Sequence, residues 1–159
     1  MLIATRSGKI NISKEKDTKL VAERLCKFIN LGDFILFTGN LGVGKTTFIK
    51  YIINSLQRIN RQEISEVPSP TFNITNEYQI KKILIKHYDL YRIKNEKELN
   101  NLGIQENLKK QITLIEWPKI ANKLKIKNSI NLIFKYNKSY TKRYLTIISK
   151  NKKIINEFK

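Results

Sequence analysis

Short continuous apolar runs and longer runs with helical spacing alternate along the chain, which predicts an α/β fold. Residues 34–38 are apolar and β-favouring, as a buried strand of a parallel sheet should be. Residues 46–56 follow with the spacing of an amphipathic helix, carried by Phe48, Ile49, Ile52, Ile53 and Leu56. A strand that leads directly into a helix therefore forms the first recognisable unit of the fold.

A second amphipathic helix is expected before that strand, from Ser13 to Ile29. Its predicted buried residues are Leu20, Val21, Leu25 and Phe28. Cys26 lies among them and is the single cysteine of the chain. Free cysteines are usually buried, so we interpret it as a small core residue and not as a reactive thiol.

The second half of the chain is richer in β-favouring segments. Residues 57–67 read as the end of a helix followed by a loop. Residues 72–80 and 83–88 predict an antiparallel hairpin around Lys81-Lys82. Residues 129–136 and 143–149 predict another hairpin, with Asn137-Lys138-Ser139-Tyr140 as its turn, and residues 151–159 form either a frayed tail or a short final element.

Length and composition limit the possible classes of protein. A chain of 159 residues is expected to form one domain, 1–159, that buries roughly two thirds of its unfolded surface without a disulfide or metal. The segment Met1–Arg6 lacks the apolar stretch of a signal peptide, and no segment is long and apolar enough to cross a bilayer. We therefore expect a cytoplasmic protein with no membrane partner.

The formal net charge is +18, with lysines along the whole chain and the densest stretch in the C-terminal third. Such a charge attracts any polyanion, and it permits either a specific basic patch or lysines solvated on every face. No aromatic RNA-binding motif accompanies the lysines. Weak or indirect contact with RNA is the most that charge alone supports.

A phosphate-binding motif of the type G-x-x-x-x-G-K-[ST] lies between the predicted strand and helix. Its residues are Gly39-Asn40-Leu41-Gly42-Val43-Gly44-Lys45-Thr46-Thr47. The glycines allow successive backbone N–H groups to converge on phosphate oxygens at a helix N-terminus. Lys45 is expected to reach the β and γ phosphates, and the Thr46 hydroxyl to bind Mg²⁺. The alternative is a glycine-rich turn that binds nothing, and the motif does not name the reaction.

Four later residues are candidates for the chemistry. In Ser69-Pro70-Thr71-Phe72 the proline stiffens the loop, so Thr71 either contacts the γ-phosphate or metal or belongs to a plain turn. Asp89 and Glu116 each close a predicted strand, where a P-loop ATPase needs an acid. We assign Asp89 to the metal and Glu116 to the attacking water, with the reverse assignment left open. His87 either lines the site or is structural.

Taken in order, these motifs resemble the TsaE (YjeE) family, the ATPase subunit of the bacterial tRNA threonylcarbamoyladenosine machinery. The resemblance rests on the P-loop, Ser69-Pro70-Thr71-Phe72, His87-Tyr88-Asp89-Leu90-Tyr91-Arg92 and Glu116-Trp117-Pro118. It implies binding of ATP/ADP and Mg²⁺, with hydrolysis in association with a TsaD-like transferase and a TsaB-like companion. It also implies a nucleotide-driven switch, a catalytic role for Lys45, Thr71 and Glu116, and a place for Trp117 near the nucleotide. Packing beneath the sheet edge is the alternative role for Trp117.

Some features depart from this family or leave other functions open. Asn40 stands where the family commonly has Asp, which removes a charge but keeps a short polar turn residue. Arg92 either offsets phosphate charge or pairs with a surface carboxylate. A small-molecule P-loop kinase is the main alternative, although the second half offers only Arg92 and Arg143 for an arginine-bearing lid. A GTP switch lacks its N-K-x-D signature, and a nucleic-acid module rests on charge alone.

The fold class that we expect is a three-layer P-loop sandwich. Its central sheet is mixed but mostly parallel, has helices on both faces and carries an antiparallel C-terminal extension. The nucleotide is expected at the C-terminal edges of the P-loop strand and its neighbours, where open α/β sheets bind their ligands.

Overall fold

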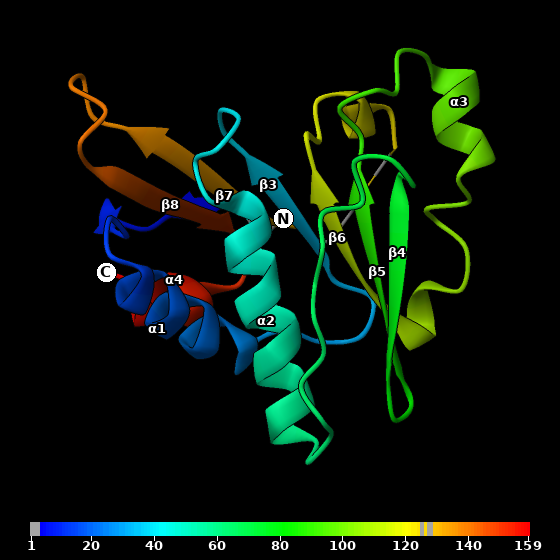
Figure 1. The fold of residues 1–159 in the computed structure, drawn as a ribbon, viewed down its shortest axis with the longest axis horizontal. Helices are drawn as coiled ribbons and strands as arrows, with labels where there is room; N and C mark the ends of the chain where they lie inside the picture. Colours follow the sequence, from blue (N-terminus) through cyan, green and yellow to red (C-terminus); the bar gives the residue numbers. More distant parts are fainter. Residues whose placement is uncertain (1–3, 125, 127–128) are drawn as a thin grey trace.

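One mixed β-sheet with helices on both faces forms the core of the computed structural model (Figure 1). The structure describes residues 4–124, 126 and 129–159. Residues 1–3 of the predicted N-terminal segment, and Lys125 and Lys127 of the lysine-rich third, lie outside the described residues. The expected α/β class is confirmed by this arrangement.

The predicted strands and helices occur in the expected order, and β1, β2, α3 and two 3₁₀ turns are additional. The strands are β1 (Thr5–Arg6), β2 (Ile10–Asn11), β3 (Phe34–Thr38), β4 (Thr75–Ile80), β5 (Ile83–Asp89), β6 (Gln111–Glu116), β7 (Ser129–Tyr136) and β8 (Arg143–Ser149). The helices are α1 (Glu15–Cys26), α2 (Lys45–Ile59), α3 (Glu96–Asn101) and α4 (Lys152–Glu157), with short 3₁₀ turns η1 (Leu108–Lys110) and η2 (Ile120–Lys123).

The strand order places the P-loop strand between two parallel neighbours. The order is β1-β8-β7-β3-β6-β5-β4, with β2 also paired to β8. Strand β3 runs parallel to both β6 and β7, and β5 runs parallel to β6. The C-terminal ends of β3, β5, β6 and β7 therefore share one edge, and the β7–β8 hairpin turns back at that same edge.

Three helices cover one face of the sheet. Helix α2 crosses the front of the sheet in Figure 1, with α1 and α4 beside it. Their buried apolar residues form one core with the inward residues of the strands. An aromatic cluster joins the P-loop strand, the following helix and β7: Phe48 lies edge-on to Phe37 and Phe134, with ring centroids 6.2 and 5.6 Å away. Packing thus fixes the loop at both of its ends.

The opposite face is covered more lightly. Leu99 of α3 and Ala121 of η2 pack against Phe34, Leu36 and Ile115 in a second, smaller cluster. Helices therefore lie on both faces, as expected, but the second face has only short ones. A surface pocket on this face, lined in part by Leu36, is described below.

The predicted first helix is shorter than expected and one of its core assignments is wrong. The buried stripe of α1 contains Thr18, Val21, Ala22, Leu25 and Cys26. Leu20 is 54% exposed because helical geometry turns it away from that stripe. Phe28 is half-buried beyond the helix end. Cys26 is buried, as expected, and burial raises the pKa of its thiol to about 12.

Both hairpins are confirmed, with one change at the start of β4. Residues 71–73 form a turn in which the Ile74 N–H donates to the Pro70 carbonyl, so the strand begins only at Thr75. Phe72 is consequently 83% exposed. The final segment is the short helix α4, held to α1 by an ion pair between Arg24 and Glu157. In the part of the chain that the structure describes, no helix is long and apolar enough to span a membrane.

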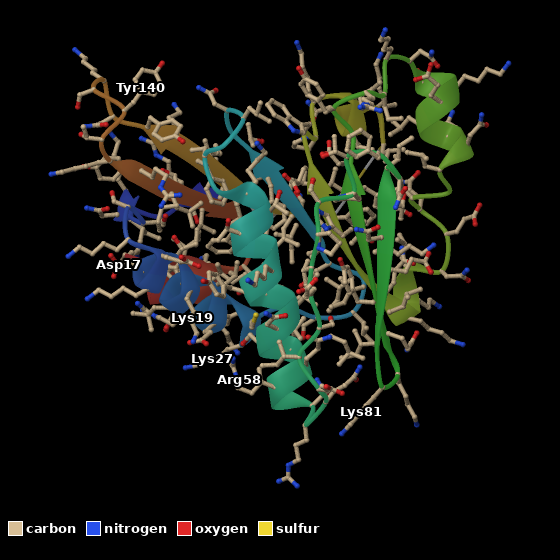
Figure 2. All side chains as sticks on the ribbon, viewed as in Figure 1. Asp17, Lys19, Lys27, Arg58, Lys81 and Tyr140 are labelled. Atoms are coloured by element: carbon tan, nitrogen blue, oxygen red, sulfur yellow. The ribbon has the colours of Figure 1, made fainter. Side chains whose placement is uncertain are left out.

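Basic side chains point outward from several elements. Figure 2 shows Lys19 on α1, Lys27 just after the end of α1, Arg58 on α2 and Lys81 at the β4–β5 turn. Arg58 pairs with Glu23 of α1 at 3.0 Å. This spread agrees with the interpretation that much of the positive charge is solvated on separate faces.

Candidate nucleotide-binding site

The P-loop connects the end of β3 to the start of α2. Gly42 and Gly44 have φ angles of +73° and +105°, a left-handed backbone that glycine adopts without steric cost. At Gly39 a Cβ atom would lie only 2.8 Å from the Phe134 carbonyl oxygen of β7. The loop therefore needs glycine for its turns at two positions and for close strand packing at a third.

Lys45 begins helix α2 and folds back over the loop. Its Nζ donates to the carbonyl oxygens of Gly39 and Asn40, both at 2.9 Å, and only 4% of the residue is exposed. Burial lowers the pKa of the ammonium, against the opposing effect of the negative charges on Glu116 and Asp89. The cation is thus held at the loop by acceptors that a phosphate could replace.

Thr46, Glu116 and His87 form a chain of contacts behind the loop. The Thr46 hydroxyl donates to Glu116 Oε1 at 2.9 Å, and His87 Nε2 lies 2.9 Å from the same oxygen. Glu116 is 3% exposed and His87 is fully buried. Strand pairing produces this contact because Glu116 is opposite Phe37, at the end of the P-loop strand, and β5 brings His87 alongside β6. His87 is therefore part of the site.

Asp89 lies one strand further from the loop, opposite Glu116 in the β5–β6 register. Its Oδ2 accepts the Thr71 hydroxyl at 3.0 Å and its Oδ1 accepts the Tyr91 N–H at 3.0 Å. Ser69 lies 2.7 Å from the Thr71 hydroxyl. The Ser69–Phe72 loop is thus joined to the acidic side of the site through Asp89.

Trp117 lies under the P-loop lysine and not in an unrelated part of the core. Its backbone is left-handed, with φ +55°, and its N–H donates to the Phe37 carbonyl at 3.3 Å. The Lys45 ammonium lies 4.0 Å from the centre of the indole ring, a cation–π contact, and Tyr91 packs on it at 4.9 Å. The ring also lines a pocket of about 450 Å³ with Asn40 and Asn131 on the second face of the sheet.

Three residues of the β7–β8 hairpin approach the loop without having been predicted to do so. The Tyr136 hydroxyl donates to the Gly42 carbonyl at 3.0 Å, and Tyr140 packs on Tyr136 with ring centroids 5.3 Å apart. Arg143 brings Nη1 to within 3.1 Å of where a Cβ at Gly44 would be. Only the parallel pairing of β7 with β3 brings them there, and no local sequence motif signals that pairing. Arg92, by contrast, lies 5.1 Å from the Phe72 ring centre.

The donor set of this edge fits Mg²⁺ bound together with phosphate. No cluster of three or more His, Cys, Asp or Glu side chains suited to a metal occurs within residues 4–124, 126 and 129–159. Mg²⁺ does not require one, since it usually takes one or two carboxylates and completes its shell with phosphate oxygens and water. Thr46, Asp89 and Glu116 supply the hard oxygen ligands that this ion prefers.

Comparison with known proteins identifies the family of the chain. The family model described as threonylcarbamoyl adenosine biosynthesis protein TsaE matches residues 12–145. Proteins named tRNA threonylcarbamoyladenosine biosynthesis protein TsaE from Rickettsia felis and Rickettsia conorii are each 37% identical over 113 residues, 71% of this chain. The matched region spans 64% and 62% of those two relatives' lengths.

More distant relatives cover a similar share of the chain. The protein of that name from Bacillus subtilis is 33% identical over 121 residues, 76% of this chain and 72% of the relative. The crystal structure of Bacillus subtilis YdiB superposes with a TM-score of 0.74 at 22% identity, covering 98% of this chain and 93% of the other, which shows a shared fold. The motifs, the fold and the match over residues 12–145 together show that this chain belongs to the TsaE family.

Proposed function

We propose that this chain is a Mg²⁺-dependent ATPase that assists a TsaB/TsaD-type threonylcarbamoyl transferase in forming threonylcarbamoyladenosine next to the tRNA anticodon. The observation that carries the proposal is the convergence of Lys45, Thr46 and Glu116 at one sheet edge. Lys45 bonds to two carbonyl oxygens of the loop, and Thr46 bonds to Glu116, all at 2.9 Å. Membership of a tRNA-modification family favours this function over the small-molecule kinase.

The loop would bind the triphosphate through its backbone and one lysine. The first N–H groups of a helix have no acceptor within the helix, so those at the N-terminus of α2, which has no side-chain cap, would bind phosphate oxygens, and the helix adds partial positive charge there. Lys45 would exchange its two carbonyl acceptors for phosphate oxygens, which form stronger, charge-assisted hydrogen bonds. Trp117 would keep the lysine side chain in place by remaining packed beneath it.

The two acids, Asp89 and Glu116, would have different roles, one in metal binding and the other in activating water. Mg²⁺, when bound, would neutralise charge on the phosphates and fix their orientation. Thr46 and Asp89 would hold it, and Glu116 would orient or deprotonate the attacking water. The Thr46–Glu116 hydrogen bond supports the reverse assignment, in which Glu116 serves the metal. Variants of the two acids, described in the Discussion, separate the alternatives.

The Ser69–Phe72 loop would transmit to the partner subunits whether ATP or ADP is bound. Thr71 is bonded to Asp89, so a ligand that draws Asp89 toward a metal changes the support of this loop. Phe72, 83% exposed, follows directly and offers an apolar surface to a partner subunit. We propose that tRNA contacts this chain only weakly or indirectly, and that the protein acts in the cytoplasm with its partners.

Calorimetric titration with ATP and Mg²⁺ tests the first step of this proposal. Lys45→Ala removes the charge-assisted phosphate contacts, each worth about 1.5–3 kcal/mol, so we expect affinity to fall roughly 100-fold. Lys50→Ala is the matched control, because Lys50 is an exposed lysine on the same helix. Unchanged ATP binding in a folded Lys45→Ala protein, or equal loss in both variants, would contradict the P-loop assignment.

A further inference from the structure

We propose that the open face of β7 and β8 is a binding surface for single-stranded RNA, with the ring of Tyr144 as its stacking platform. This surface contains none of the residues assigned to phosphate, metal or water, and its use does not require ATP hydrolysis. The choice of RNA as the ligand rests on the proposed function, in which the chain works beside a tRNA. The inference gives the weak RNA contact of that proposal a defined place on the molecule.

The sheet face opposite α1, α2 and α4 is open at β7 and β8. Leu132 and Phe134 of β7 belong to the core beneath those helices. Side chains alternate along a strand, so Ile133 and Lys135 point to the opposite face. The second cluster covers that face at β3, β5 and β6, and among the described residues it contains none from β7 or β8. Helix α3 lies beside β4 and β5, at the other end of the sheet (Figure 1).

Strand pairing gathers aromatic, aliphatic and basic side chains on this open face. Tyr144 of β8 is opposite Lys135 of β7, and Thr146 is opposite Ile133. The two residues of such a pair lie on the same face of the sheet. A groove of about 440 Å³ is lined by these four residues, and Lys9, from the segment between β1 and β2, lines it as well. The groove thus brings an aromatic ring together with the side chains of two lysines.

The strands that carry this face have basic residues and no acidic ones. The chain has 13 Asp and Glu residues, and none of them lies in residues 1–14 or 117–156, the segments that contain β1, β2, β7 and β8. Lys9 and Lys135 are exposed, and in the part of the chain that the structure describes neither is in an ion pair. Lysines without carboxylate partners attract a phosphate backbone and release its counterions on binding. The charge of this face therefore fits a polyanion.

The groove suits unpaired nucleotides better than it suits other polyanions. Tyr144 is half-buried and lines the groove, so the sheet holds its ring where a base can stack. Stacking on an aromatic side chain accepts any base, because every base has a π-face, and it requires a base that is free of a duplex. An anionic membrane surface would need protruding apolar side chains, whereas Ile133 and Ile148 are half-buried. The face therefore suits single-stranded RNA, bound through backbone charge and a stacked base.

Fluorescence anisotropy of a labelled oligouridine, measured at low salt without ATP, tests the stacking platform. Tyr144→Ala should weaken oligouridine binding about tenfold, within the range for loss of one stacking contact. Tyr144→Phe keeps the ring and should bind like the wild type. Heparin, a polyanion without bases, should compete for the same surface, and its affinity should be unchanged in Tyr144→Ala.

The lysines are tested through the salt dependence of binding, which remains measurable if Tyr144→Ala fails to fold. The double variant Lys9→Gln/Lys135→Gln should reduce the slope of log affinity against log salt by about 1.4, since each phosphate contact to a single strand contributes roughly 0.7. Lys81→Gln/Lys82→Gln is the matched control, because these exposed lysines lie at the β4–β5 turn, at the other end of the sheet (Figure 2). The control should keep both the affinity and the slope of the wild type.

Each of four results would overturn the inference. The wild type would fail to bind oligouridine at low salt, or Tyr144→Ala would bind it as tightly as the wild type. Equal losses in the two lysine double variants would reduce binding to general attraction by net charge. Tyr144-dependent binding of polyglutamate, without binding of oligouridine, would make the ligand an acidic protein segment.

These outcomes are distinguishable from a failure of the proposed function. Phosphate release with the partner pair tests that function, and it does not depend on the open face of β7 and β8. A wild type that binds oligouridine through Tyr144 but releases no phosphate would contradict the ATPase and not the RNA surface. Stimulated release from a chain that binds no oligouridine would contradict the RNA surface alone.

Discussion

The two flanks of the P-loop differ in burial and in chemistry. On the β5–β6 flank His87, Asp89 and Glu116 are 0%, 6% and 3% exposed and are bonded to neighbouring side chains. On the β7–β8 flank the groups beside the loop are aromatic and basic, and Tyr140 is 70% exposed. One flank is a buried polar network and the other an open aromatic surface.

This difference shows what each flank can contribute. Buried carboxylates require fixed hydrogen-bond partners, and a network that satisfies them also holds them in one geometry before a ligand arrives. Such a flank suits charge that must be positioned accurately, as at a metal or an attacking water. An exposed ring makes few directional demands and suits a base, whose binding depends on contact area.

The largest effect is expected from Glu116→Gln, which removes the negative charge of one acid on the β5–β6 flank and keeps the size of its side chain. The amide oxygen can still accept the Thr46 hydroxyl, so the fold and ATP affinity should be preserved. Hydrolysis with the partner pair should fall by roughly 10²–10⁴-fold, the range for loss of a general base. Phosphate release measured beside Glu96→Gln, an exposed control on α3, checks this. Normal turnover in Glu116→Gln would return Glu116 to a structural role.

An intermediate effect is expected from Asp89→Asn, which tests whether Asp89 or Glu116 binds the metal. Loss of a metal ligand should weaken ATP binding about tenfold with Mg²⁺ present and leave Mg²⁺-free binding unchanged. Asp17→Asn on α1, labelled in Figure 2, is the matched control. Equal losses with and without Mg²⁺ would show that Asp89 shapes the Ser69–Phe72 loop. The Mg²⁺-specific loss appearing in Glu116→Gln instead would establish the reverse assignment.

The smallest effect is expected from Tyr136→Phe on the aromatic flank. It removes one neutral hydrogen bond, from the hydroxyl to the Gly42 carbonyl, and keeps the ring. Because the bond supports the loop and not the base, affinity for ATP and for tripolyphosphate should fall together, about two- to fivefold for a neutral bond of this kind. Titration of both ligands measures it. A loss confined to ATP would mean that the hydroxyl serves the base.

The sequence predicts the acidic flank far better than the aromatic one, and the reason is physical. The P-loop follows an apolar strand, and Asp89 and Glu116 each end one. Parallel strands have their C-terminal ends at the same edge of a sheet, so the local pattern predicts that these three groups lie close together. Tyr136, Tyr140 and Arg143 reach the loop only because β7 pairs with β3, which lies more than ninety residues earlier in the chain. No local sequence pattern predicts that pairing.

Some local features were also beyond prediction from sequence. The exposure of Leu20 depends on which stripe of α1 faces the sheet, and tertiary packing decides that. The turn at residues 71–73 replaces the predicted start of β4 because the Ile74 N–H bonds to Pro70. The hairpin 129–149, in contrast, has the bounds that its alternation and turn residues predict.

Phosphate release from ATP, by the purified chain alone and with its cognate TsaB–TsaD pair, tests the central claim most directly. Lys45→Ala, added to the same pair, provides the blank. The account predicts release that the pair stimulates and that Lys45→Ala abolishes. Absence of release with and without the pair, or release that persists in Lys45→Ala, would contradict an ATPase that works within the threonylcarbamoyl transferase complex.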